Sequence, residues 1–176
     1  MEGELLMTSN ELNIYESFLP QYINILKQNP SKEILTKMMG IIGEHDSASI
    51  VNGKVTNGKG SDVTVLDFQK VKTVSGDVSL KPSDLVETKT TFVETENGKK
   101  VCVKNLGGKE GNCDFIFICD YRSDHMKRFI IPADVFFDRA LLSDINYTCQ
   151  FKWDSDYIPK GKYASNTTLL MEYEIV

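Results

Sequence analysis

Hydrophobic positions in the first 44 residues recur at three- and four-residue spacings, which is the pattern of an amphipathic helix. A capping box formed by Thr8 and Glu11 predicts the start of a first helical segment, which Pro20 kinks or restarts and Pro30 ends. A second helix begins near Ser31, and its apolar stripe consists of Ile34, Leu35, Met38, Met39, Ile41 and Ile42. We therefore expect residues 1–44 to be helical.

Further along the chain, hydrophobic positions recur at every second residue, which is typical of strands. Residues 62–74 alternate between apolar and polar positions and predict one strand, followed by a turn at residues 75–77. A second strand, rich in β-branched residues, is predicted for residues 85–93. The Asn97-Gly98 pair favours a tight hairpin turn, with residues 100–104 returning beside that strand.

An apolar run at residues 115–119 is too short for a helix and predicts a buried central strand. Residues 128–131 predict a short strand, and Pro132 is expected to open a helix that runs to about Ser143. Strand-like patterns follow at residues 147–153 and 168–176. The predicted fold class is α/β, with a mixed β-sheet flanked by helices, N-terminal helices and C-terminal strands.

The composition fits one compact domain. The chain has 176 residues, of which 41% are hydrophobic and 26% are charged. We expect a single domain over residues 1–176, with a helical part at 1–44, a core at 53–143 and C-terminal strands at 147–176. The net charge of −5 does not indicate a general nucleic-acid binder, although binding depends on where the positive charge lies.

The expected location is the cytoplasm, without membrane association. No apolar run approaches the ~18 residues of a membrane span, and the N-terminus lacks the pattern of a signal peptide. The four cysteines form no C-x-x-C pair and are expected to be thiols. Only two histidines are present, which argues against a Cys/His zinc site.

The chemically informative residues lie on two of the predicted strands. Asp62 begins one strand, and 25 residues later Glu87 and Lys89 project from one face of the other. If the strands are neighbours, the three side chains form one cluster. Two carboxylates can hold Mg²⁺ at a phosphodiester, a lysine can position water or stabilise charge, and the Thr88 carbonyl can supply a further metal ligand.

These residues resemble the PD-(D/E)xK nuclease superfamily, which includes many type II restriction endonucleases. Gly60-Ser61-Asp62 stands in place of the Pro-Asp half, with Ser61 where proline is commonest, and Glu87-Thr88-Lys89 matches the second half. The order of the predicted elements from about residue 34 to about residue 142 is also similar.

The resemblance implies a restriction-endonuclease-like core and Mg²⁺-dependent cleavage of double-stranded DNA. Asp62, Glu87 and the Thr88 carbonyl would bind the metal, and Lys89 would position water or stabilise charge. A type II restriction enzyme would usually be a homodimer, because a palindromic target has two equivalent strands.

Several alternatives stay open. Glu87 and Lys89 can instead form a marginal pair on an exposed strand face, although the apolar flanking residues favour an interior strand. Within the same fold, a structure-selective or RNA-directed nuclease and a non-catalytic binding module are both compatible with the pattern. A helical carboxylate often completes such sites in the family, and the candidates are Glu11, Glu16, Glu33 and Glu44.

Positive charge for DNA contact is available between residues 54 and 109, in ten lysines. They are Lys54, Lys59, Lys70, Lys72, Lys81, Lys89, Lys99, Lys100, Lys104 and Lys109. Candidate base-reading segments are the glycine-rich loop at 107–112, the turn at 122–128 and residues 154–166. Phe151 and Trp153 share a strand face and are expected in the core.

Overall fold

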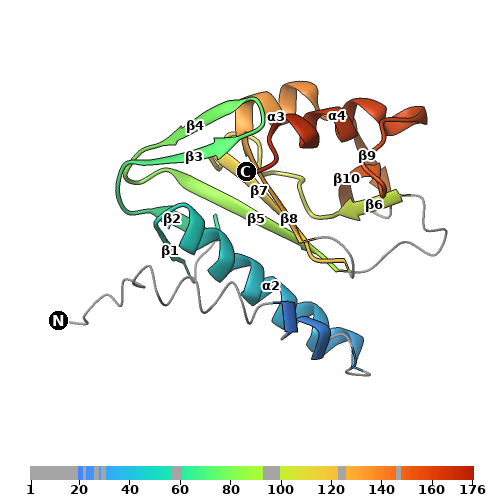
Figure 1. Cartoon of the computed structure of the whole chain (residues 1–176), viewed down its shortest axis with the longest axis horizontal. Coiled ribbons are helices and arrows are strands. Elements are labelled where there is room, and N and C mark those ends of the chain that lie inside the picture. Colours follow the sequence, from blue (N-terminus) through green and yellow to red (C-terminus); the bar gives the residue numbers. More distant parts are fainter. Residues whose placement is uncertain are drawn as a thin grey trace.

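The computed structural model describes residues 20–21, 23–25, 28, 31–56, 61–92, 100–122, 126–145 and 148–176 (Figure 1). The capping box at Thr8 and the Asn97-Gly98 turn lie outside these residues. The helices are α2 (Lys32–Ile50), α3 (Ala133–Arg139), η1 (Gly161–Tyr163) and α4 (Ala164–Glu172). The strands are β1 (Gly53–Val55), β2 (Val63–Val65), β3 (Gln69–Thr73), β4 (Gly76–Leu80), β5 (Leu85–Thr91), β6 (Lys100–Val103), β7 (Phe115–Asp120), β8 (Lys127–Pro132), β9 (Leu142–Ile145) and β10 (Thr148–Asp154).

A five-stranded mixed sheet forms the centre, in the order β1-β2-β5-β7-β8. Strands β5 and β7 are parallel, and the other neighbouring strands are antiparallel. Helix α2 packs on one face of this sheet, and α3, α4 and the three-stranded sheet β6-β10-β9 cover the other (Figure 1). The predicted class, α/β with a mixed sheet and flanking helices, is therefore confirmed at this level.

Strand β7 shows why the sequence forms such a core. All six of its residues are buried, because alternate side chains point to opposite faces of the sheet and both faces are covered. Phe117 packs in the hydrophobic cluster with α2, whereas Ile116 and Ile118 pack in the cluster with α3, α4 and β10. The prediction of a buried central strand at 115–119 is confirmed.

Helix α2 approaches the sheet closely at Gly43. A Cβ atom added there would lie 2.0 Å from Thr90 Oγ1 on β5, so no larger side chain fits without a shift. One turn further on, Ser47 Oγ and Thr88 Oγ1 are hydrogen-bonded at 2.7 Å. The helix continues to Ile50, beyond the end predicted near residue 44, and places Glu44 beside β5 and β2.

The predicted strand at 62–74 is interrupted. Residues 63–65 belong to the central sheet as β2, whereas residues 69–73 form β3, which pairs with β4 in a separate hairpin and is bridged to the C-terminal segment through Thr73 and Ile175. Residues 66–83, which contain β3 and β4, begin and end at the same place in the sheet. Val65 N donates a hydrogen bond to Asp84 O, and Ser83 N donates one to Val65 O, both at 2.9 Å. The adjacent apolar residues Val65 and Leu66 interrupt the alternation where β2 ends.

Pairing of β6 also differs from the prediction. Strand β6 is antiparallel to β10, with Val103 opposite Phe151, and is not the hairpin partner of β5. The neighbours of β5 in the sheet are β2 and β7. A hairpin signal from two residues was therefore outweighed by burial of Val101 and Val103 against Phe151 and Trp153.

The last third of the chain contains two further corrections. Helix α3 ends at Arg139 instead of near Ser143, because Ala140 is extended and residues 142–145 pair with β10. The strand predicted at 168–176 is wrong, since residues 164–172 form α4 and only isolated bridges at Glu174 and Ile175 follow. Phe151 and Trp153 are fully buried, as expected for core residues.

The four cysteines are free thiols, as expected. Across the described ranges, no helix combines the length and apolar character needed to cross a membrane.

Candidate active site

Asp62 lies where β2 meets β5. The register pairs Val63 with Val86, so one step further along both strands places Asp62 opposite Glu87. Asp62 N donates to Val86 O at 3.1 Å, and Thr88 N donates to Asp62 Oδ2 at 2.8 Å. The backbone of β5 thus fixes the Asp62 carboxylate at the edge of the strand pair.

Glu87 is a buried carboxylate held by two lysines. Its side chain is 1% exposed in the middle of β5. Lys89 Nζ donates to Oε1 at 2.5 Å, and Lys109 Nζ donates to Oε2 at 2.7 Å. The lysines are 17% and 25% exposed, so both stems reach from the solvent side to an almost fully buried carboxylate.

Lys109 belongs to the connection between β6 and β7, and no sequence motif singles it out. It was one of ten lysines expected to contribute positive charge, and its loop was expected to read bases. The structure places its ammonium on Glu87 instead. No local spacing relates a loop residue to a strand 22 positions earlier, so sequence reasoning had no signal for this contact.

Glu44, on α2, is a helical candidate whose carboxyl is coupled electrostatically to this cluster. Partial burial raises its pKa, and the charges of Asp62 and Glu87 raise it further, whereas Lys89 lowers it. Within the part of the chain that the structure describes, no hydrogen bond or ion pair engages the Glu44 carboxylate. Glu44 is therefore electrostatically coupled to Asp62, Glu87 and Lys89, a choice that the sequence left open.

Among the other helical candidates, Glu33 is not part of the cluster. Glu33 lies near the start of α2, is exposed, and pairs with Lys37 at 3.5 Å. Glu11 and Glu16 lie outside the described residues.

The cluster carries more negative than positive charge. Burial raises the pKa of Asp62, and the Glu87 charge raises it further, while the Thr88 amide, Lys89 and Lys109 act in the opposite direction. Three carboxylates face two ammonium groups. Raised carboxyl pKa values that follow from burial and like charge are typical of sites that bind a cation or perform proton transfer.

The donor set fits Mg²⁺ chemically. Asp62, Glu87 and Glu44 offer hard carboxylate oxygens, the ligand type that Mg²⁺ prefers. The Thr88 amide points toward β2, where it donates to Asp62. The amide and the carbonyl of one strand residue point to the same neighbouring strand, so the Thr88 carbonyl also points toward β2. In the described ranges, no group of three or more His, Cys, Asp and Glu side chains is already gathered around one metal position.

Three residues from the segments predicted to read bases have structural roles instead. Arg122 is 2% exposed and its guanidinium is bonded to Asp120, while Arg128 Nε donates to Asp46 at 2.6 Å. Asn166 is fully buried, donating to Leu141 O and Lys152 O and accepting from Leu141 N. These side chains are not available to base edges.

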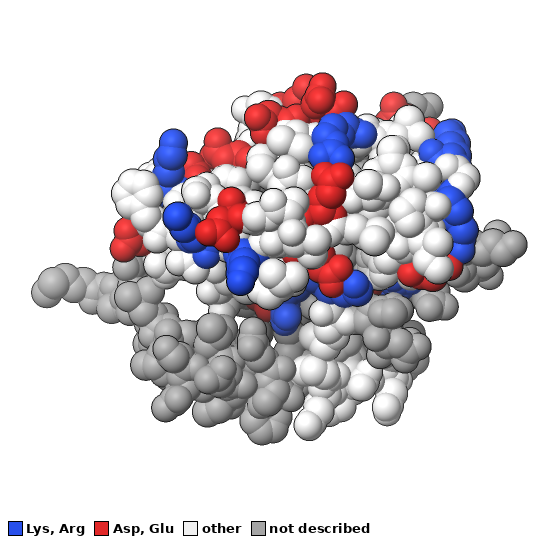
Figure 2. Space-filling model, turned by 45° about the horizontal axis from the view of Figure 1, so that its top comes forward, with Lys and Arg blue, Asp and Glu red and all other residues white. Residues whose placement is uncertain are grey.

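The expected lysines are spread over the surface. Figure 2 shows basic and acidic side chains interspersed on the face that it displays. The exposed members of the set are Lys54, Lys70, Lys72, Lys81 and Lys104. Lys59 and Lys99 lie outside the described residues.

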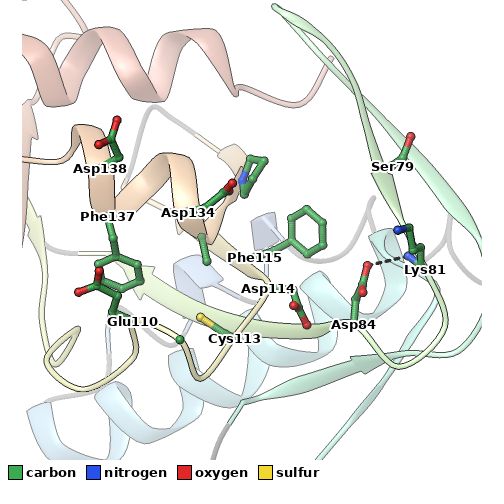
Figure 3. A pocket seen from close by; sticks show the side chains of 13 residues that line it. Ser79, Lys81, Asp84, Glu110, Cys113, Asp114, Phe115, Asp134, Phe137 and Asp138 are labelled. Atoms are coloured by element: carbon green, nitrogen blue, oxygen red, sulfur yellow. Dashed lines mark hydrogen bonds between the residues drawn. The ribbon is translucent and has the colours of Figure 1, made fainter.

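A hollow of about 830 Å³ lies at the starts of β5 and β7, between β4, α3 and the 110–114 segment (Figure 3). Its acidic lining consists of Asp84, Glu110, Asp114, Asp134 and Asp138. Asp114 Oδ2 accepts from Leu85 N at 2.8 Å, so this carboxylate ties β7 to β5. Burial and the Glu87 charge raise the pKa of Cys113 to about 11, which favours the protonated thiol at neutral pH.

Comparison with known proteins gives no further identification. No protein-family model matches the chain. No curated protein matches it either.

Proposed function

We propose that this chain is a Mg²⁺-dependent endonuclease that hydrolyses DNA phosphodiester bonds, of the type II restriction kind. The observation that carries the proposal is the meeting of Asp62, Glu87 and Lys89 at the junction of β2 and β5, with Glu44 electrostatically coupled to them. The proposed protein works in the cytoplasm as a homodimer on double-stranded DNA.

The arrangement of elements supports this proposal. A helix, α2, precedes the antiparallel strands β1, β2 and β5, and β7 then lies parallel to β5. The resemblance to PD-(D/E)xK nucleases implies such an order, with the carboxylates on neighbouring strands of a mixed sheet. Strand β8 leads directly into α3, as in the predicted order.

In the proposed mechanism, Asp62, Glu87 and the Thr88 carbonyl hold Mg²⁺. When bound, the metal supplies positive charge for the scissile phosphate and lowers the pKa of a coordinated water. Lys89 donates hydrogen bonds to the attacking water or to the phosphate oxygens, where negative charge grows in the transition state. Glu44, whose pKa is raised, is suited to hold a proton or orient water beside the metal ligands.

A non-catalytic binding module is the second candidate, and the ion pairing of Glu87 favours it. Both carboxylate oxygens accept from ammonium groups, which by itself is a complete structural pairing. A structure-selective or RNA-directed nuclease uses the same cluster and differs only in the polymer that it cuts.

The test is cleavage of plasmid and phage DNA by the purified protein in Mg²⁺ and in EDTA. We expect discrete metal-dependent fragments from the wild type and a loss of at least about 10³-fold in rate for Glu87→Gln and Lys89→Ala. Glu110 is an exposed carboxylate next to Lys109 in the same loop. The Glu110→Gln variant is the matched control and should cut DNA like the wild type.

The result that contradicts the proposal is equally direct. A wild type that leaves DNA and single-stranded RNA intact in Mg²⁺ and Mn²⁺ would favour the binding module. So would cleavage that survives unchanged in both site variants.

A further inference from the structure

The Glu87 carboxylate has one more lysine than its local motif supplies. Lys89, two residues along β5, already balances the charge of Glu87. Lys109 comes from the connection between β6 and β7 and takes the second oxygen at 2.7 Å. Two ammonium groups therefore contact the carboxylate that is proposed to bind the metal.

The connection is built to present Lys109. Leu106 is 1% exposed and anchors the segment in the core. Lys109 N donates to Leu106 O at 3.3 Å, and Asn112 N donates to Lys109 O at 3.0 Å. Gly108 and Gly111 take φ values of +72° and +73°, which glycine adopts without strain. The backbone of Lys109 is thus fixed by two tight turns.

The ammonium lies near the position that a divalent cation needs. It contacts Glu87 Oε2, and its charge also acts on the Asp62 carboxyl, the other proposed ligand. An ammonium and a divalent cation compete for the same carboxylate oxygen, because their like charges repel strongly at contact distance. The Lys109 side chain is 25% exposed and has a flexible stem, so it can leave Glu87 while the turns stay in place.

We propose that Lys109 is a built-in counter-cation of Glu87, which the metal must displace in order to bind. It balances the buried carboxylate when no metal is bound and sets the metal concentration at which the site fills. Once displaced, its ammonium lies at the rim of the site, where it can bind a phosphate oxygen of the substrate. The inference rests on the proposed function, since it takes Glu87 as a metal ligand.

The test measures metal binding without cleavage. Metal-free wild type, Lys109→Met and Lys104→Met are titrated with Mg²⁺ in a calorimeter in the absence of DNA. Lys104 is exposed on the same connection and is the matched control. We expect about tenfold tighter Mg²⁺ binding for Lys109→Met, because one competing positive charge is removed, and wild-type affinity for Lys104→Met.

A second readout follows the melting temperature with and without Mg²⁺. Without metal, Lys109→Met should melt below the wild type, since Glu87 then has a single counter-charge. Addition of Mg²⁺ should raise its melting temperature more than that of the wild type. Lys109→Arg keeps the charge and should behave like the wild type in both measurements.

The outcomes separate this inference from the proposed function. If Lys109→Met binds Mg²⁺ no tighter than the wild type while Glu87→Gln abolishes binding, the counter-cation is ruled out and the metal site stands. If neither the wild type nor Lys109→Met binds Mg²⁺ or Mn²⁺, both proposals fail. Tighter binding confined to Lys109→Met supports both.

Discussion

Glu87 and Asp120 project from the same face of the central sheet, and the clusters around them differ in how their charge is balanced. At the end of β7, Asp120 is fully buried and faces Arg122, which is 2% exposed. Arg122 Nη2 donates to Asp120 Oδ2 at 2.7 Å and to Ser155 O at 2.9 Å, and the Tyr157 hydroxyl also donates to Asp120. One carboxylate meets one guanidinium and a phenol, so the Asp120 cluster is balanced.

The Glu87 cluster lies a few residues earlier along β5 and β7 and is not balanced in this way. It combines Glu44, Asp62 and Glu87 with Lys89 and Lys109, and the pKa values of Glu44 and Asp62 are raised. Burial of charge alone therefore does not mark a functional site, since Asp120 is as deeply buried as Glu87. An excess of one sign among partly solvated groups is the more specific indication.

Removing the cation of the balanced cluster should have the largest effect on stability. Arg122→Met leaves Asp120 buried without its guanidinium, and we expect a loss of about 3–5 kcal/mol in the free energy of unfolding. Urea denaturation measures this. Arg139→Met, which breaks an exposed pair with Glu172 whose side chains are 39% and 37% exposed, is the control and should cost at most about 1 kcal/mol. Equal losses in the two variants would contradict the comparison.

Removing a carboxylate from the Glu87 cluster should increase the free energy of unfolding. Asp62→Asn relieves repulsion with Glu87, and the asparagine carbonyl still accepts from Thr88 N. We expect the metal-free protein to gain up to about 1 kcal/mol at neutral pH. Under the proposed function, the same variant loses Mg²⁺-dependent cleavage. A variant less stable than the wild type in urea would show that Asp62 is a structural residue.

The pH dependence of stability sharpens the same contrast. The pKa of Asp62 is raised above its ordinary 3.8, so the folded protein keeps this proton to a higher pH than the unfolded chain. The contribution of Asp62 to the free energy of unfolding therefore falls as pH rises from about 3.8 to the folded pKa, and is constant above it. Urea midpoints across the acidic range should decline less steeply with pH in Asp62→Asn than in the wild type. Identical profiles would contradict the raised pKa.

The smallest effect is expected at Glu44. Glu44→Gln removes the charge that repels Asp62 and Glu87, and because the side chain is partly exposed we expect a slight rise in melting temperature without metal. Glu33→Gln on the same helix loses an exposed pair with Lys37 and should not rise. Differential scanning calorimetry compares the two. If the melting temperature rises in both variants, the overall charge of the helix explains the effect and the coupling of Glu44 to the cluster does not.

Local patterns were sufficient for the part of the fold that holds the site. The β-branched run of β5 and the apolar run of β7 identify their strands, and alternation puts Glu87 and Lys89 on one face. Asp62 could be placed beside them because consecutive strands usually pair. The meeting of these three side chains was therefore predictable, while their catalytic role stays a prediction.

The remaining features depend on contacts distant in sequence. Thr167 and Thr168 look like strand residues, yet they form α4, where Thr167 Oγ1 donates to Asp154 Oδ2 at 2.9 Å. Burial of Leu169 and Leu170 against the sheet adds to this preference. Lys109 lies in a loop without periodicity, so only the folded chain reveals its contact with Glu87.

The excursion through β3 and β4 has a consequence for the design of simpler versions of this protein. Residues 66–83 leave and rejoin the central sheet at one place, where Val65 and Asp84 are hydrogen-bonded. The distance in sequence between Asp62 and Glu87 is thus set by this hairpin and not by the geometry of the cluster. A chain in which a short turn replaces the hairpin would lose the buried side chains of Val71, Val78 and Leu80 and the bridge between Thr73 and Ile175. Pattern searches for similar clusters should allow a variable gap at this point.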